Sequence, residues 1–155
     1  MSWLQRAGLA ASGSRLGGIV YHRLCRHLDR VLIPLSGGRF STGPRDTLLL
    51  TTRGARSGRR RVAALAFLRD GDDIAVIASK GGAPQHPAWY HNLKAHPRAR
   101  LEYHGIVEER TAREALGEER DKLFECAKTA YSTYSAYEAR AVHRTIPVMV
   151  LSRIH

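Results

Sequence analysis

Alternating apolar and polar positions predict a chain built mostly of short β-strands joined by tight turns. The strongest signal is Asp70-Gly71 between two apolar segments, which is typical of a hairpin turn. His104-Gly105 separates a second pair of alternating segments in the same way. The strands expected from these patterns cover residues 46–52, 60–68, 73–79, 98–103, 106–115 and 146–154.

Helical patterns occur in stretches that do not alternate regularly with the strands. Residues 14–35 carry leucines on one face and arginines on the other, residues 117–131 start with acidic side chains, and a tyrosine-rich piece follows to about Arg144. We therefore expect the α+β class, as a small, mostly antiparallel barrel of about six strands with flanking helices. The chain is then one domain, with an N-terminal amphipathic helical segment at 1–35 and the barrel at 46–155.

The net charge narrows the kinds of partner that this domain can bind. The chain has 155 residues, and 25 basic residues against 14 acidic ones give a net charge of +11. Only four of the basic residues are lysines, so arginine supplies most of the positive charge. Because the planar arginine side chain pairs well with phosphate and carboxylate groups, we expect an anionic partner: a nucleic acid, an acidic membrane, or a phosphorylated or polycarboxylate ligand.

The N-terminal segment allows two interpretations. Trp3, Leu4 and Leu9 lie beside Arg6, so the segment either packs on the core with a solvated face or docks reversibly on an anionic membrane. No run approaches the roughly 18 apolar residues of a membrane span, and we expect no cleaved signal peptide. Two cysteines in no metal or redox spacing favour a reducing compartment. We expect a cytoplasmic protein, or one peripheral on the inner face of the cell membrane.

The turn between the first two expected strands is crowded with arginines. Residues 51–61, which we name the arginine loop, contain two glycines and five arginines. The glycines let backbone N–H groups approach an oxyanion, and the arginines add charge. The Gly-Lys-Ser/Thr sequence of a nucleotide phosphate loop is missing here. Because like charges this close repel one another, an anion-binding site is favoured over a solvated basic loop.

A second unusual segment joins a strand to a helix. Residues 79–84, which we name the glycine turn, end a strand, and a helix is expected to begin near Pro87. A helix N-terminus preceded by glycines attracts negative charge, and Lys80 adds to it. A pocket with aromatic sides for a flat, partly anionic ring system is one interpretation. The other is that Trp89 simply anchors the core.

Other kinds of chemistry find little support in the sequence. His86, His91 and His96 are five residues apart, which rotates a helix by about 140°, so we expect no shared face and no metal site. The sequence has no Gly-x-Ser-x-Gly elbow and no promising Cys–His arrangement. The acidic clusters at 108–109 and 114–121 are expected on solvated surfaces. We therefore expect the chemistry to come from a bound cofactor.

Three tyrosines form the last unusual pattern. Tyr131, Tyr134 and Tyr137 are spaced by three and cover about 120° of a helix. Their hydroxyl groups all need partners or water. One interpretation is the polar, aromatic side of a pocket, and the other is a half-buried amphipathic face.

Together, the segments "LLLTTRGARSGRRR", "SKGGAPQHPAWYHNL" and "YSTYSAYEARAVHRTIPVMVL" closely resemble the deazaflavin-dependent nitroreductase family, within residues 47–151. Members of this family take a hydride from reduced coenzyme F420. The resemblance implies a split β-barrel and an F420-dependent oxidoreductase of the quinone reductase or nitroreductase type. The acceptor would be a quinone, such as menaquinone, or a nitro-aromatic compound.

The resemblance also assigns roles to individual residues. Those expected to hold the phosphate and oligoglutamate tail of the coenzyme are Arg53, Arg56, Ser57, Gly58 and Arg60. Those expected to cradle the deazaflavin ring and its side chain are Ser79, Lys80, Gly81, Gly82, Ala83, Pro84, Trp89, Tyr90 and Asn92. The acceptor would meet Tyr131, Tyr134 and Tyr137, with Tyr134 the first candidate for the proton donor. Phe67 stands where the family often has tyrosine, which removes a polar contact from that side.

Three other functions stay open on the residues alone. The chain could be an FMN-binding split-barrel protein, a basic nucleic-acid-binding protein, or a carrier that binds the deazaflavin coenzyme without turning it over. The nucleic-acid interpretation has the charge in its favour, but no helix-turn-helix, zinc finger or RNA-binding aromatic motif is found.

Overall fold

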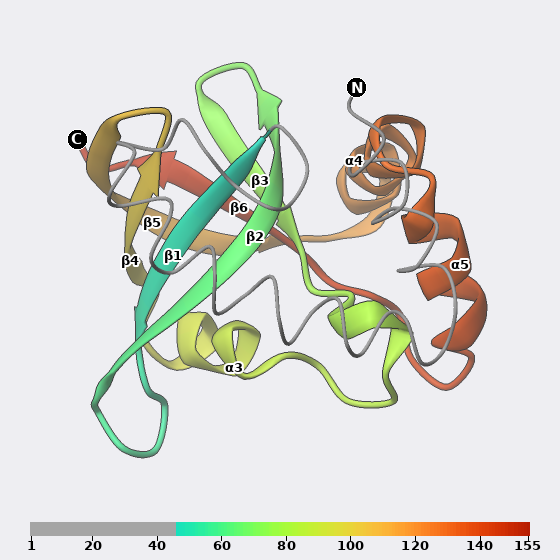
Figure 1. Cartoon of the computed structure of the whole chain (residues 1–155), viewed down its shortest axis with the longest axis horizontal. Helices are drawn as coiled ribbons and strands as arrows, with labels where there is room; N and C mark the ends of the chain where they lie inside the picture. The colour runs from blue at the N-terminus through green and yellow to red at the C-terminus, as the bar shows by residue number, and fades with distance from the viewer. Residues whose placement is uncertain (1–45) are drawn as a thin grey trace, which may run out of the picture.

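Six antiparallel strands form a closed barrel in the computed structural model, which describes residues 46–155 (Figure 1). Around the barrel the strand order is β1-β2-β3-β6-β5-β4. The strands are β1 (Thr47–Arg53), β2 (Arg60–Asp70), β3 (Asp73–Ile77), β4 (Arg98–Tyr103), β5 (Ile106–Ala115) and β6 (Val148–Arg153). The α+β barrel expected from the sequence is confirmed, while the N-terminal segment at 1–35 lies outside the described residues.

The interior of the barrel follows from the alternation along each strand. Leu48 and Leu50 on β1 point inward, as do Ile74 and Val76 on β3, and all four are fully buried. Phe67 on β2 belongs to the same core, and its ring contacts Tyr103 edge to face with 5.3 Å between centroids. Phe67 is only 1% exposed, so in this chain its ring fills the barrel.

Within residues 46–155, three α-helices pack against the barrel in different places (Figure 1). Helix α3 (Ala88–Ala95) closes one end, where Trp89 and Leu93 enter the barrel core. Helix α4 (Gly117–Ala130) packs on β3 and β6, and helix α5 (Thr133–Arg140) packs on α4 and on residues 80–82. Side chains of both helices and of these two strands form a second apolar cluster. Among residues 46–155, no helix has the length and apolar content needed to cross a bilayer.

A buried arginine organises part of the barrel interior. Arg110 on β5 is only 1% exposed, and its guanidinium donates to the backbone carbonyls of Asp72 and Leu151 at 2.6 and 3.0 Å. It also pairs with Glu108 at 2.7 Å, and the Tyr103 hydroxyl donates to the same carboxylate at 2.6 Å. The solvated position expected for Glu108 is therefore wrong: a buried arginine needs a carboxylate partner, and Glu108 supplies it.

Candidate active site

The arginine loop is the closed turn of the β1–β2 hairpin. The Gly54 N–H donates to the Arg59 carbonyl at 2.8 Å, and the Gly58 N–H donates to the Gly54 carbonyl at 2.9 Å. The Ser57 hydroxyl accepts from the Arg59 N–H at 3.3 Å, so it shapes the loop. Gly58 has a φ of 65°, a left-handed conformation that favours glycine.

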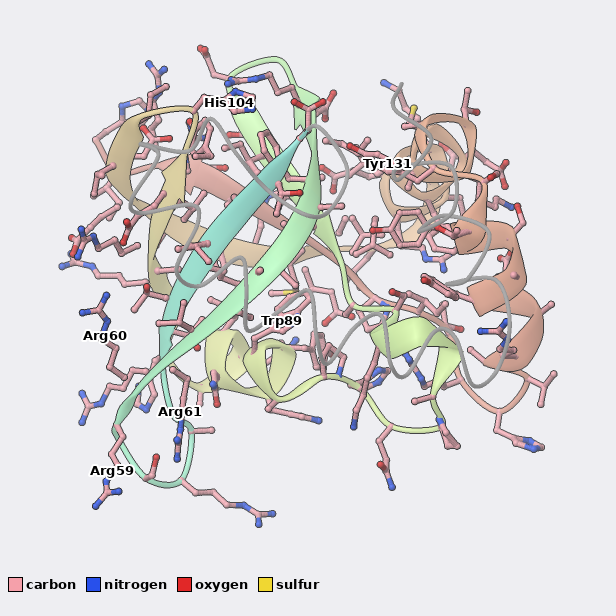
Figure 2. The ribbon with its side chains drawn as sticks, viewed as in Figure 1. Arg59, Arg60, Arg61, Trp89, His104 and Tyr131 are labelled. Atoms are coloured by element: carbon pink, nitrogen blue, oxygen red, sulfur yellow. The ribbon has the colours of Figure 1, made fainter. Side chains whose placement is uncertain are left out.

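The arginines of the loop are available to an anion. In Figure 2, Arg59, Arg60 and Arg61 project from the hairpin into solvent. Across the part of the chain that the structure describes, none of the five arginines pairs with a carboxylate, and all five are exposed: Arg53, Arg56, Arg59, Arg60 and Arg61. Several guanidinium groups without a carboxylate on one hairpin suit a ligand that carries more than one negative charge.

Asn92 joins the arginine loop to α3. Its side-chain oxygen accepts from the Ala55 N–H at 2.9 Å, and its amide nitrogen donates to the Thr52 hydroxyl at 3.0 Å. Asn92 is 6% exposed. The structure thus places Asn92 where it supports the loop that carries the arginines.

The glycine turn has an unusual backbone. Ser79 is in the right-handed helical region, whereas Lys80, Gly81 and Gly82 follow with φ values of 47°, 66° and 79°. A right-handed residue followed by a left-handed one directs successive N–H groups into one concave surface, which is a recurrent anion-binding arrangement. Lys80 is exposed, and a lysine at positive φ costs on the order of 1–3 kcal/mol. Strain of this kind is common at functional sites.

The glycine turn packs directly on helix α5. A Cβ at Gly82 would lie 2.6 Å from the Tyr137 carbonyl oxygen and 2.7 Å from Cβ of Arg140. Position 82 therefore requires glycine both for its backbone angle and for this contact. The glycine turn and the tyrosine helix, which lie far apart in sequence, form one unit.

Arg144, which the sequence did not single out, holds the same turn. Its guanidinium donates to the carbonyls of Ser79 and Ala83 at 2.7 and 2.8 Å. No local pattern predicts this role, because the partners lie 65 and 61 positions away. Partial burial lowers the pKa of Arg144, which still leaves an arginine charged at neutral pH.

The start of α3 is occupied by side chains with structural partners. Trp89 points into the barrel and is 5% exposed (Figure 2). Of the two interpretations that the sequence allowed, its position is that of an anchor of the core. The Tyr90 hydroxyl donates to Glu114 at 3.0 Å, and Lys94 donates to the same carboxylate at 2.8 Å. Burial opposes ionisation of Glu114, but these two bonds outweigh it and hold the pKa of the carboxyl below its usual range. The solvated surface position that the sequence suggested for Glu114 is therefore wrong.

The three tyrosines form a packed cluster. Tyr131 lies at the end of α4, ahead of α5, so the three do not share one helix as their spacing suggested. Ring centroids are 6.1 Å apart between Tyr131 and Tyr134, and 5.8 Å apart between Tyr134 and Tyr137. Tyr134 and Tyr137 are 8% and 4% exposed, while Tyr131 is half-buried. The structure therefore places two of the three in the apolar cluster beneath α5.

Burial also makes these phenols weaker acids. It raises the pKa of Tyr131 to about 12, with Asp46 adding to the shift. The pKa of Tyr134 is raised further, again mainly by burial. Both hydroxyls stay protonated at neutral pH, and Tyr131 is the more accessible of the two. The role of Tyr134 as proton donor stays a prediction.

The predicted residues therefore lie in two groups. The glycine turn meets α5, and the arginine loop meets α3, but the arginine loop and Tyr131 lie on well separated parts of the molecule (Figure 2). A ligand that touches both has to be long. An open cleft of about 250 Å³ lies beside the starts of α3 and α4, and Tyr90 alone of the predicted residues lines it.

Two of the three histidines come closer than their spacing suggested. His86 precedes α3 and His91 lies within it, which brings their ring centroids to 6.0 Å. Between residues 46 and 155, no three His, Cys, Asp or Glu side chains gather as a metal site.

Comparison with known proteins extends this description. The chain matches the sequence model of the F420H(2)-dependent quinone reductases over residues 23–153. An F420H(2)-dependent quinone reductase of Mycobacterium tuberculosis (strain ATCC 25618 / H37Rv) is 37% identical over 114 residues, which cover 72% of this chain and 76% of the relative. The solved structure of an F420-H2 dependent reductase, FDR-A, is 40% identical with a TM-score of 0.64, and the match covers 70% of this chain and 95% of that one.

A more distant neighbour shares the fold alone. HutZ, the heme storage protein from Vibrio cholerae, is 12% identical with a TM-score of 0.53, over 72% of this chain and 83% of that one. The barrel is thus of the split-barrel class, and the protein is an oxidoreductase. The chain belongs to the F420H(2)-dependent quinone reductase family, so reduced coenzyme F420 is its cofactor.

Proposed function

We propose that the chain reduces a quinone with reduced coenzyme F420 at an elongated site, which runs from the arginine loop along the glycine turn to the tyrosine cluster. The observation that carries this proposal is the combination of an exposed arginine hairpin with a left-handed turn packed on α5. The family resemblance implies a coenzyme with a phosphodiester and several carboxylates on a long tail. The length and charge of this tail suit the distance between the arginine loop and the glycine turn.

The arginine loop is the proposed binding site for the tail. Arg53, Arg56 and Arg60 are exposed, and each charge-assisted pair with a phosphate or carboxylate contributes roughly 1.5–3 kcal/mol before screening by solvent. Ser57 and Gly58 fix the loop conformation from which these side chains project. Asn92 supports the loop from α3, so its contribution is indirect.

The glycine turn is the proposed site of the ring. The bound coenzyme supplies the hydride. Backbone N–H groups of residues 79–81 and the Lys80 ammonium offer donors to an anionic or carbonyl edge of the ring. Gly81, Gly82, Ala83 and Pro84 complete a surface with little side-chain bulk, which suits a flat ring. The contribution of Trp89 and Tyr90 is indirect, since Trp89 is in the core and the Tyr90 hydroxyl is bound to Glu114.

The acceptor is the proposed partner of the tyrosines. A quinone, or alternatively a nitro-aromatic compound, has to stack on the ring within about 3–3.5 Å for hydride transfer. Tyr131 is half-buried and can orient an acceptor oxygen, while Tyr134 packs against Tyr131 and Tyr137 packs against Tyr134. The proton that completes the reduction comes from Tyr131, Tyr134 or water.

A titration tests the cofactor and its site together. We expect the protein to bind F420 more tightly than FMN or NADPH, measured by quenching of cofactor fluorescence. Lys80→Ala should weaken F420 binding, whereas Lys122→Ala, which removes an exposed lysine from α4, should leave it unchanged. FMN binding as tight as F420 binding would favour the flavin alternative. Equal effects of both lysine variants would reject the glycine turn as the ring site.

Two further assays, reoxidation of the reduced coenzyme and nucleic-acid binding, address the remaining alternatives. A carrier would bind F420 but give no reoxidation of the reduced coenzyme when quinones or nitro compounds are added. A nucleic-acid-binding protein would bind DNA or RNA with sequence preference. Weak, salt-sensitive DNA binding without preference is the outcome expected from charge alone.

We propose, finally, that the chain works in the cytoplasm and meets lipid-soluble quinones at the inner membrane surface. The support is the sequence pattern of residues 1–35, with Trp3, Leu4 and Leu9 beside basic residues. Co-sedimentation with anionic liposomes should fall when Leu4 and Leu9 are replaced by glutamate in the full chain. Equal co-sedimentation of both proteins would contradict the membrane proposal.

A further inference from the structure

We infer that Arg144 is a positioning residue: it fixes the conformation of the glycine turn and thereby sets how the coenzyme ring is presented to the acceptor. This inference rests on the proposed function of the glycine turn. The sequence patterns had assigned Arg144 no role in coenzyme binding.

The guanidinium of Arg144 bridges both ends of the turn. Nη2 donates to the Ser79 carbonyl at 2.7 Å, and Nε donates to the Ala83 carbonyl at 2.8 Å. Nη1 lies 3.3 Å from the Ala78 carbonyl and 2.9 Å from Nδ1 of His86. Because the three nitrogens lie in one plane, they fix the distance between the strand that enters the turn and the segment that leaves it.

The turn has few bonds of its own to hold this shape. The Gly82 N–H donates to the Ser79 carbonyl at 2.9 Å, and the Ala83 N–H donates to the Lys80 carbonyl at 3.2 Å. Between these bonds, Lys80 adopts a positive φ that a free chain rarely populates. Such a conformation persists when surrounding contacts determine it, and Arg144 supplies hydrogen bonds at both ends of the turn.

Arg144 is itself fixed to the tyrosine helix. Its backbone N–H donates to the Ala141 carbonyl at 3.1 Å, directly after the end of α5. Arg140 on α5 reaches the Gly81 carbonyl at 3.4 Å, and Gly82 contacts the Tyr137 backbone. The geometry therefore ties the proposed ring site to the proposed acceptor site through the last turn of α5 and the residues that follow it.

The role of Arg144 depends on the shape of its side chain as well as its charge. A lysine at this position keeps the charge but offers a single nitrogen, which cannot bridge the Ser79 and Ala83 carbonyls in one plane. Arg120 provides a matched control. Its Nε and Nη2 donate to the Ile146 carbonyl at 3.1 and 2.9 Å, so it makes the same kind of side-chain-to-backbone bond, but to residue 146 instead of the glycine turn.

The test compares Arg144→Lys with Arg120→Lys in the full chain, using F420 as the probe. We expect the F420 dissociation constant of Arg144→Lys to rise at least about tenfold, while that of Arg120→Lys stays within about threefold. At saturating coenzyme, kcat with a water-soluble quinone should fall in Arg144→Lys, because the ring is presented differently, while the KM for the quinone stays unchanged in both variants. Their melting temperatures, measured without coenzyme, show how much of any effect is loss of stability.

The outcomes separate this inference from the proposed function. Wild-type affinity in Arg144→Lys, or an equal loss of affinity in both variants, would overturn the positioning role. If Lys80→Ala also keeps wild-type affinity, the assignment of the glycine turn to the coenzyme fails, and the inference fails with it. Should Arg144→Lys not fold, Arg144→Gln, which keeps a planar amide, gives the same comparison with the same expected direction.

Discussion

The side-chain oxygen of Asn92 accepts a hydrogen bond from the backbone N–H of Ala55 at 2.9 Å, across 37 positions of sequence. The contact joins the arginine loop to α3, whose Trp89 and Leu93 enter the barrel core. The conformation of a charged, exposed loop is therefore set by a buried amide on a neighbouring helix. Because the amide also bonds the Thr52 hydroxyl, its two polar groups are both in use.

Removing this amide should loosen the loop and destabilise the domain. Asn92→Ala leaves the buried Thr52 hydroxyl and the Ala55 N–H without their partner, which costs roughly 1–3 kcal/mol of the free energy of unfolding. Urea unfolding measures this change. Thr52→Val, which removes one of the two bonds, is the control and should cost less. An Asn92→Ala protein as stable as the wild type would show that the amide does not hold the loop.

Arg60 should act on the tail of the coenzyme. Arg60→Ala should weaken binding of F420 with its glutamate tail much more than binding of a form that lacks the glutamates. High salt should reduce the difference, because exposed charge pairs are screened. Arg61 is the matched control, since neighbouring residues of a strand point to opposite faces. Equal weakening of the two coenzyme forms would mean that the loop has another function.

Phenylalanine variants should show whether a tyrosine hydroxyl donates the proton or the tyrosine rings only pack. Phenylalanine at position 131 or 134 keeps the ring and removes the hydroxyl. If either phenol is the general acid, its variant should lose roughly 100-fold in turnover while F420 affinity changes little. Single-turnover oxidation of the bound coenzyme by a quinone measures this loss. Unchanged rates in the Tyr131, Tyr134 and Tyr137 variants alike would assign the proton to solvent.

The pH profile of a tyrosine-dependent step also follows from burial. With its pKa raised to about 12, Tyr131 stays protonated from neutral pH to well above the ordinary range of a phenol. A step that needs its proton should therefore keep its rate across that range. A fall in rate centred near pH 10, roughly the ordinary value for a phenol, would contradict Tyr131 as the donor.

Because of His86, the free energy of unfolding of the protein should decrease as the pH falls. Burial, followed by the positive charge of Arg144 and the nearby His91, lowers the pKa of His86 below its ordinary value of 6.5. The folded protein therefore favours neutral His86. Its contribution to stability is complete above the ordinary pKa and is lost as the pH falls through the lowered pKa. Glu114, whose charge opposes the shift, stays ionised in this range because its own pKa is also lowered.

The substitution His86→Asn isolates this effect, because it keeps an acceptor for Arg144 and removes the titrating group. Thermal melting of the wild type and the variant, compared between neutral and mildly acidic pH, should show a smaller decrease in melting temperature for the variant. Parallel decreases in the two proteins would assign the pH dependence to other groups.

Local sequence signals predicted the strands well and the long-range contacts poorly. The hairpin at His104-Gly105 was predicted with the observed bounds of β4 and β5, because alternation and a turn dipeptide are both local. The final strand begins at Val148, later than expected, since Pro147 has no N–H to donate to a strand ladder. The barrel itself followed from the succession of hairpins.

The parts of the site that the sequence did not reveal depend on distant partners. The bonds of Arg144 to residues 78–86 span 58 to 66 positions, and those of Asn92 to the arginine loop span 37 and 40. The burial of Tyr134 likewise depends on Phe124 and on β3 and β6 beneath the helices. Spacing by three identified the tyrosines as a group, but only the packing of α4 and α5 places them in an apolar cluster.

The most direct test of the proposed site is single-turnover oxidation of reduced F420 by a water-soluble quinone, with wild-type protein in excess over coenzyme and Arg60→Ala and Lys80→Ala alongside. We expect rapid oxidation by the wild type, much weaker coenzyme binding in Lys80→Ala, and a loss in Arg60→Ala that depends on the glutamate tail. Rapid oxidation with wild-type coenzyme affinity in both variants would contradict the proposed site, because the coenzyme would then bind elsewhere on the barrel.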